Sequence, residues 1–310
     1  MNKIKKWAPY LLSAFILAIG AYFLSQNLDQ YLELLEFSIP TVLILALVGV
    51  LFILGNGVNN YVLYRHLGAQ VSLNESVGLA AINTLANYLP FAGGMLAKSV
   101  YLRKRHQVPY GRFFSATLSL FVCLISANGL LGLLVLSSWF LRGDPVQPIL
   151  WFGYGVMFAI ILILFVPIPE RIIPQRLKKS FDSLTEGWQI IIKTPSLFLT
   201  LIGIQLVMMV LSALRFWLAF RLYSQEISFG QAILFATAIV LTQIVSLTPG
   251  GLGVREGIVA ALAITQSYPA DIAVLAVATD RLIATIVFFI LGTIYTTILG
   301  QDQTKREFEV

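Results

Sequence analysis

The chain has 310 residues, of which 58% are hydrophobic and 12% are charged, and its formal net charge is +6. A soluble domain usually carries about 25% charged residues, so this composition excludes an ordinary soluble protein and predicts an integral membrane protein. The basic residues follow membrane topology, and we expect no nucleic-acid partner. The single cysteine, Cys123, excludes an intramolecular disulfide.

Six apolar segments are long enough to form full transmembrane helices, since a hydrocarbon core of about 30 Å takes about 20 helical residues. The start of the chain, MNKIKKW, resembles the basic end of a signal peptide. No A-x-A cleavage site follows it, so we expect the first span to be retained. The predicted spans are residues 8–25, 39–64, 113–140, 148–167, 197–221 and 272–299.

Two further apolar segments, 76–101 and 230–267, are each interrupted near the middle. The first contains PFAGG at 90–94 and the second contains PGGLG at 249–253. Proline removes a backbone donor and glycine frees the backbone, so a helix is expected to end at each motif. We predict that each segment forms a re-entrant helical hairpin that returns to the side from which it entered.

The distribution of lysine and arginine supports this topology. With both hairpins re-entrant, both termini and the basic loops at 98–112 and 168–193 are cytoplasmic. A full crossing by 76–101 would place the basic cluster at 103–105 outside. We therefore expect a multi-pass protein of the cytoplasmic membrane whose termini are both cytoplasmic.

The two hairpins open toward opposite sides, so the chain is expected to contain an inverted repeat. The first half-repeat covers about 39–140 and the second covers about 197–299. Inverted repeats built around broken helices are typical of transporters. The predicted fold is therefore a single all-α polytopic membrane domain over 1–310, with about six full spans and two oppositely oriented hairpins.

Corresponding positions around the two breaks are chemically similar. Asn87 and Asn83 precede Pro90 by three and seven residues, while Ser246 and Thr242 precede Pro249 by the same intervals. Residues four apart share one helix face, so each hairpin is expected to carry a polar stripe toward its break. Glycines also lie four residues after each proline, at Gly94 and Gly253.

The segment 174–192 has apolar residues at helical spacing beside basic residues. This pattern predicts an interfacial helix on the anionic cytoplasmic leaflet. An amphipathic connector packed on the protein remains the alternative.

The glycine-rich run GGLGVREG at 250–257 does not indicate a nucleotide site, because Glu256 stands where the third glycine of G-x-G-x-x-G is required. Neither histidine has the spacing of a metal motif, so we expect no cofactor and no metal. A helix N-terminus after either break still favours an anion, because its free N–H groups and dipole attract negative charge.

Charged residues gather in the apolar segments of the second half, where each costs about 2.5–3.5 kcal/mol unless it is paired or solvated. One interpretation is structural pairing of Arg255 with Asp280 and of Glu256 with Arg281. The other is a polar cavity in which Arg255 and Arg281 contact an anionic substrate. Arg215 is expected either to join this site or to extend its charge outward to the membrane surface.

The polar residues of the first half are mainly amides. Asn83 and Asn87 are expected to face the protein interior, either for helix–helix hydrogen bonds or for substrate contact. Asn56, Asn59 and Asn60 carry the same two interpretations. Lys98 is predicted to lie where the first hairpin returns to the cytoplasmic leaflet, in a position to contact a lipid phosphate.

The runs NYLPFAGGMLAKSVYL (87–102), PGGLGVREG (249–257) and DRL (280–282) resemble the lysylphosphatidylglycerol synthase transmembrane-region family, whose members are also called flippase-like. The resemblance covers nearly the whole chain and implies translocation or handling of a phospholipid or a polyprenyl-linked lipid. The positions that match the family are Asn87, Pro90, Gly94, Pro249, Gly251, Gly253, Glu256 and Arg281.

This sequence departs from the family pattern in the first half. The family often has Gly-Glu-x-x-Arg after the first break, where this chain has Gly94, Met95 and Lys98. The charged pair often seen in the following span is missing from TLSLFV at 117–122. The soluble aminoacyl-transferase domain of the synthases is also missing, so we do not expect this chain alone to make lysylphosphatidylglycerol.

We therefore predict a flippase-like transporter, and not an enzyme, for an anionic phospholipid or polyprenyl-linked lipid. One alternative is a non-transporting accessory subunit that binds a lipid carrier in glycolipid or polysaccharide synthesis. Another is an intramembrane lipid-modifying enzyme that uses Glu256 and Asp280. The predicted substrate-binding residues are Asn83, Asn87, Pro90, Gly94, Lys98, Pro249, Gly251, Gly253, Arg255, Glu256, Asp280 and Arg281.

Overall fold

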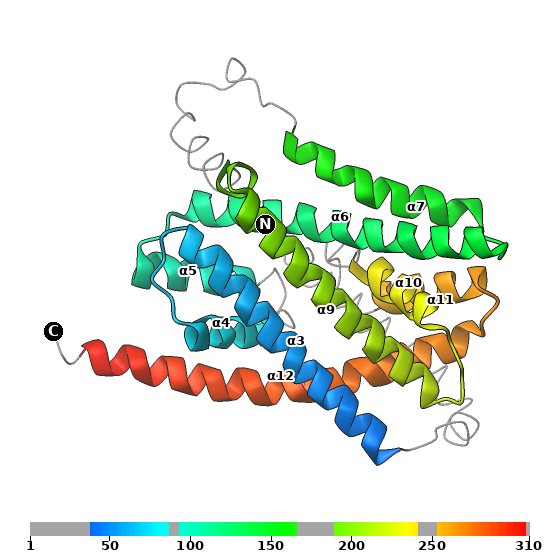
Figure 1. The fold of residues 1–310 in the computed structure, drawn as a ribbon. Coiled ribbons are helices and arrows are strands. Elements are labelled where there is room, and N and C mark those ends of the chain that lie inside the picture. The colour runs from blue at the N-terminus through cyan, green and yellow to red at the C-terminus, as the bar shows by residue number, and fades with distance from the viewer. Residues whose placement is uncertain (1–37, 87–92, 166–188, 241–252, 308–310) are drawn as a thin grey trace, which may run out of the picture. The chain divides into compact units, whose positions relative to one another are not determined.

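The structure is a computed structural model that describes residues 38–86, 93–165, 189–240 and 253–307 (Figure 1). Within these ranges every regular element is a helix. In chain order they are α3 (Ile39–His66), α4 (Leu73–Ala86), α5 (Gly93–His106), α6 (Tyr110–Arg142), α7 (Pro148–Ala159), the 3-10 helix η1 (Ile160–Phe165), α9 (Pro195–Arg221), α10 (Phe229–Ile239), α11 (Val254–Thr265) and α12 (Ala270–Glu307).

Four of the described helices are long and apolar enough to cross a membrane. They are α3, α6, α9 and the Ala270–Leu299 part of α12, and they coincide with the spans predicted at 39–64, 113–140, 197–221 and 272–299. Large apolar side chains such as Leu43 and Leu47 on α3 are exposed. The chain is therefore an integral membrane protein, since contiguous exposed apolar surface of this kind is rare on soluble monomers.

The other two predicted spans have different outcomes. Segment 148–167 is divided between α7, which ends at Ala159, and η1, and it is too short to count among the four long helices. Segment 8–25 lies outside the described residues. Of the predicted interfacial helix at 174–192, only 189–192 is described, and those residues are helical.

Each interrupted segment contains two separate helices, as the proline and glycine motifs predict. Segment 76–101 corresponds to α4 and α5, and segment 230–267 corresponds to α10 and α11. The Tyr101 hydroxyl of α5 donates to Glu75 in the first turn of α4. Just after α11, the Tyr268 hydroxyl donates to Gln231 in the first turn of α10. In each pair, the start of the first helix and the end of the second lie close together, as in a helical hairpin. Re-entry of the hairpins into the membrane and their opposite orientations stay predictions.

The predicted loop at 98–112 is helical over 98–106, because α5 continues to His106, and its cytoplasmic location stays a prediction. Leu102 is fully buried in a hydrophobic core cluster. Its packing supports the helix beyond residue 101, where the predicted hairpin ends. The basic residues Arg103, Lys104 and Arg105 occupy the last turn of α5, where positive charge complements the helix dipole.

The chain divides into two compact units. Unit 1 comprises Met1–Phe52, Thr84–Gly93 and Met209–Ile290, and unit 2 comprises Ile53–Asn83, Gly94–Met208 and Leu291–Val310. In unit 1, three phenylalanines of α9 and α10 stack, with ring centroids 5.1 Å apart for Phe220 and Phe235 and 6.5 Å for Phe216 and Phe235. The units do not correspond to the predicted half-repeats, which stay a prediction.

The core of unit 2 is aliphatic and aromatic, and its helices pack closely. Tyr64 of α3 and Phe113 of α6 are buried together, with ring centroids 6.2 Å apart. On α6, a Cβ at Gly129 would lie 2.7 Å from the carbonyl carbon of Met157 in α7, and one at Gly132 would meet the ring of Tyr154. Small residues are thus what lets α6 and α7 lie side by side (Figure 1).

Candidate functional site

Five charged side chains of unit 1 form one hydrogen-bonded group, here called the arginine–carboxylate cluster. They come from three helices: Arg215 from α9, Arg255 and Glu256 from the start of α11, and Asp280 and Arg281 from α12. All five lie in or next to strongly apolar sequence. An ionic cluster of this kind is retained in a membrane protein when its members are paired or when they serve a function.

Asp280 is the centre of the cluster and its side chain is 1% exposed. Its Oδ1 accepts a hydrogen bond from Arg215 Nε at 2.8 Å, and its Oδ2 accepts one from Arg255 Nη2 at 3.1 Å. Arg215 Nη2 also donates to the backbone carbonyl of Asp280 at 3.4 Å. One buried carboxylate therefore links α9 and α11 to α12.

Glu256 forms the second part of the cluster. Its Oε1 accepts from Arg281 Nη1 at 3.0 Å, and its Oε2 accepts from the backbone N–H of Gly253 at 2.8 Å. Gly253 precedes the first residue of α11 and has a φ of 82°, a conformation that glycine adopts without strain. Glu256 thus caps α11 and joins its first turn to α12.

The cluster carries one net positive charge, because three guanidinium groups face two carboxylates. Arg255 has the most exposed side chain of the three arginines, at 22% against 8% for Arg215 and 11% for Arg281. Its Nε is buried and has no hydrogen-bond partner among the described residues. Its guanidinium lies over the ring of Phe216, 5.5 Å from the centroid. Arg255 is therefore the member best placed to receive an additional anion.

Both predicted ion pairs are present, Arg255 with Asp280 and Glu256 with Arg281. The interpretation that Arg215 extends outward to the membrane surface is wrong, because Arg215 is buried and paired with Asp280. Inside the protein its guanidinium donates both to the Asp280 carboxylate and to the Asp280 carbonyl, so its hydrogen bonds are made there.

Three further predicted site residues are described, and they belong to the other unit. Asn83 in α4 is half-buried, Gly94 in α5 is buried, and Lys98 in α5 is half-buried. All three belong to unit 2, whereas the arginine–carboxylate cluster belongs to unit 1. Four predicted residues lie outside the described part of the chain: Asn87, Pro90, Pro249 and Gly251.

The predicted burial of the α3 asparagines is observed for two of them. Asn59 and Asn60 are buried, and Asn56 is half-buried. The Oδ1 of Asn59 has no hydrogen-bond partner among the described residues. These side chains therefore avoid lipid, as the cost of a polar group in hydrocarbon requires.

A second charged group, which the sequence analysis did not identify, surrounds Glu75, where the start of α4 meets the end of α5. Glu75 Oε1 accepts hydrogen bonds from Tyr101 at 2.7 Å and from His106 Nε2 at 2.9 Å, and Arg105 Nε lies 3.3 Å away. Ser72 and Glu75 cap α4 reciprocally. The S-x-x-E pattern at 72–75 was a signal for this cap.

The Glu75 group makes folding stability depend on pH. Burial raises the pKa of Glu75, but hydrogen bonds from Tyr101, His106 and Ser72 and the charge of Arg105 outweigh burial and hold it below its usual value of 4.5. A carboxyl group whose pKa is lowered by folding stabilises the protein above its unfolded pKa and loses that contribution as pH falls through the folded pKa.

We expect Glu75→Gln to lower the free energy of unfolding by about 1–3 kcal/mol at pH 7, because the half-buried partners of Glu75 lose a charged acceptor. The difference from the wild type should shrink as the pH falls below 4.5. Thermal unfolding in detergent across pH 3–7 measures this, with the exposed Glu226→Gln as the control. A difference that does not change with pH would contradict the assignment.

Comparison with known proteins identifies the chain. The family model for the lysylphosphatidylglycerol synthase TM region matches residues 7–292, which covers nearly all of the 310 residues and both charged groups described above. Comparison with curated proteins and with solved structures gives no significant match. The chain belongs to the lysylphosphatidylglycerol synthase TM region family.

Proposed function

We propose that this protein is a flippase-like transporter for an anionic lipid, either a phospholipid or a polyprenyl-linked lipid. The observation that carries the proposal is the net positive charge of the arginine–carboxylate cluster in a membrane protein of this family. Net charge within a membrane is costly unless it is paired or solvated, so a bound anion would stabilise the cluster.

The phosphate of a lipid head group is the anion that the bilayer itself supplies. A guanidinium presents its donors in a plane that matches two phosphate oxygens, and Arg255 has a buried Nε with no hydrogen-bond partner among the described residues. Arg255 also lies in the first turn of α11, where the helix dipole favours negative charge. We place the lipid phosphate at Arg255, with Arg281 next to it.

The other predicted site residues extend this proposal. Asn87 and the glycines Gly94, Gly251 and Gly253 would supply amide and backbone contacts near the helix breaks. The prolines Pro90 and Pro249 would keep the helices interrupted there. Movement of one half of the chain against the other would carry the head group across, as happens in inverted-repeat transporters.

The cluster gives less support to an intramembrane enzyme. Acid–base chemistry by Glu256 and Asp280 would require carboxylates free to exchange protons with a substrate. In the structure Asp280 is held by Arg215 and Arg255, and Glu256 is held by Arg281. We therefore assign these carboxylates the role of positioning the arginines.

The experiment that tests this function is reconstitution in lipid vesicles. A fluorescent phosphatidylglycerol or polyprenyl phosphate is placed in both leaflets, and an impermeant reductant then quenches the outer leaflet. We expect the protein to raise the rate at which inner-leaflet label becomes quenched above the rate in protein-free vesicles. Stable binding of the lipid without any faster exchange would instead support an accessory, non-transporting subunit.

A further inference from the structure

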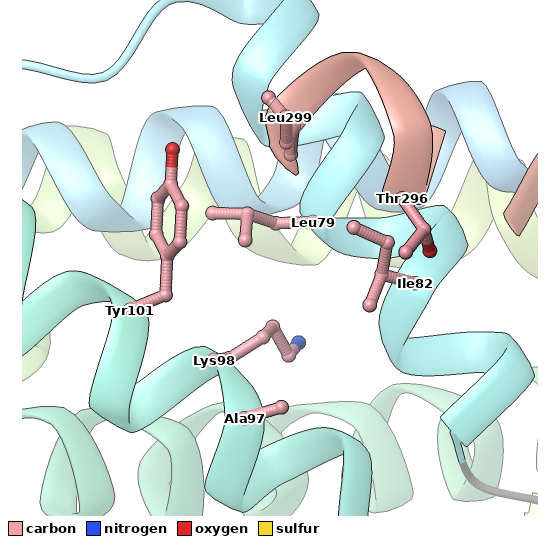
Figure 2. Close-up of a pocket in the computed structure, with 7 residues that line it drawn as sticks. All are labelled: Leu79, Ile82, Ala97, Lys98, Tyr101, Thr296 and Leu299. Carbon is pink, nitrogen blue, oxygen red and sulfur yellow. The ribbon is translucent and has the colours of Figure 1, made fainter. Parts of the chain in front are cut away.

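Unit 2 contains a pocket of about 210 Å³ that is lined by none of the residues of the arginine–carboxylate cluster. All seven of its lining residues belong to unit 2, and they come from α4, α5 and the last part of α12 (Figure 2). Its lining residues are Leu79 and Ile82 from α4, Ala97, Lys98 and Tyr101 from α5, and Thr296 and Leu299 from α12.

Among the described side chains that line this pocket, Lys98 alone has a polar group without a partner. Figure 2 shows its ammonium group pointing into the pocket, between the side chains of Ala97 and Ile82. It makes no hydrogen bond or ion pair with another described residue. The Tyr101 hydroxyl is engaged by Glu75, and the Thr296 hydroxyl donates to the carbonyl of Gly292 at 2.7 Å.

The pocket opens at a surface that carries apolar side chains. Ala97 and Thr296 line it and are themselves exposed. On either side of Ala97 along α5, Leu96 is 52% exposed and Val100 is 41% exposed. In a membrane protein such a surface contacts lipid chains. Lys98 therefore places a positive charge inside an apolar pocket that is accessible from apolar surroundings.

We propose that this pocket binds a singly charged anionic amphiphile, with its phosphate or carboxylate on Lys98 and the adjoining part of one chain against Leu79, Ile82 and Leu299. A single ammonium balances a single negative charge. An apolar cavity of about 150 Å³ holds a molecule as large as benzene, so 210 Å³ accommodates an acidic group with a short length of chain, but not two whole chains.

This site deepens the proposed function, and it rests on that function only for the source of the ligand, which is the bilayer. The ligand class that the first hairpin recognises is then an acidic group attached to a hydrocarbon chain. A free phosphate ion shares the charge but not the chain, and a fatty alcohol shares the chain but not the charge. Comparing an acid on a hydrocarbon chain with free phosphate and with a fatty alcohol therefore shows whether binding needs the charge, the hydrocarbon chain or both.

The test measures binding to the purified full chain in a neutral detergent, by the ligand-dependent shift of its thermal unfolding. We expect saturable binding of oleate, binding of oleyl alcohol that is weaker by about tenfold or more, and no competition from inorganic phosphate. Competition by inorganic phosphate as effective as that by oleate would overturn the assignment to an amphiphile.

Three variants locate the site. Lys98→Met keeps the length of the side chain and removes its charge, and we expect a loss of about tenfold or more in oleate affinity. Lys98→Arg should keep most of the affinity. Lys104→Met makes the same chemical change at an exposed position of α5 outside the pocket, and it should bind as the wild type does.

The stability of the ligand-free variants makes the test independent of folding. Because Lys98 has no partner in the described structure, Lys98→Met should unfold at the same temperature as the wild type or at a higher one. Unchanged oleate affinity in Lys98→Met, or a lower unfolding temperature without ligand, would overturn the proposal.

The outcome is also separable from that of the transport proposal. Oleate binding that depends on Lys98 in a protein that moves no lipid would support the pocket and contradict the transporter. Lipid movement together with oleate binding that does not depend on Lys98 would support the transporter and contradict the assignment of the pocket.

Discussion

Asp280→Ala is expected to lower the free energy of unfolding by about 3–5 kcal/mol, which is the cost of removing one partner of a buried ion pair. Asp280 is 1% exposed and is hydrogen-bonded to both Arg215 and Arg255. Its removal leaves two neighbouring guanidinium groups without their shared counter-charge. It also removes the Asp280 links of α9 and α11 to α12, so that only the Glu256–Arg281 pair still joins α11 to α12.

Denaturant unfolding in detergent measures this effect, with two comparison variants. Asp271→Ala removes a carboxylate from the exposed first turn of the same helix and should have a much smaller effect. Asp280→Asn keeps the shape of the side chain and should fall between the two. Equal stability of Asp280→Ala and Asp271→Ala would show that the cluster contributes nothing to the fold.

Arg255→Ala is expected to reduce the anionic lipid that remains bound to the purified protein by about tenfold to a hundredfold, as for the loss of a charge-assisted hydrogen bond. The folded state should survive this change, because Asp280 keeps Arg215 and Glu256 keeps Arg281. The remaining cluster is then electrically balanced. Arg255→Ala thus removes the attraction for an anion without breaking the structure.

Quantitative mass spectrometry of the bound lipid measures this prediction. The matched control is Arg221→Ala, because Arg221 is exposed at the end of α9 and its guanidinium lies 4.4 Å from the centroid of the Trp217 ring. It lies outside the cluster, so its removal should leave the bound lipid unchanged. Equal loss in both variants would show that positive charge in general, and not the cluster, retains the lipid.

The sequence predicted the helices and their interruptions because both depend on local chemistry. Long apolar runs require helices, and the glycines and prolines at 90–94 and 249–253, most of which lie outside the described residues, predict where the helices are interrupted. The two predicted ion pairs share one spacing: Arg255 and Asp280, like Glu256 and Arg281, are 25 residues apart. The basic residue comes first in α11 and second in α12, so this equal spacing pairs each positive side chain with a negative one. This complementarity is visible in the sequence alone.

Other parts of the site depend on packing that local patterns do not contain. Arg215 lies 65 residues from Asp280, and a single arginine in an apolar helix gives no indication of which way it faces. The group around Glu75 joins residues 26 and 31 apart, and its partners Tyr101, Arg105 and His106 fall in the predicted loop at 98–112. Once α5 continues to His106, both Tyr101 and His106 reach Glu75.

The most direct test of the account is the rate of lipid exchange between leaflets, measured for an anionic and a zwitterionic lipid in the same reconstituted vesicles. Labelled phosphatidylglycerol and phosphatidylcholine differ in net charge but can carry the same chains. The account predicts that the protein accelerates exchange of phosphatidylglycerol more than that of phosphatidylcholine, and that Arg255→Ala removes this preference. Equal acceleration of both lipids by the wild type, or a preference that persists in Arg255→Ala, would contradict it.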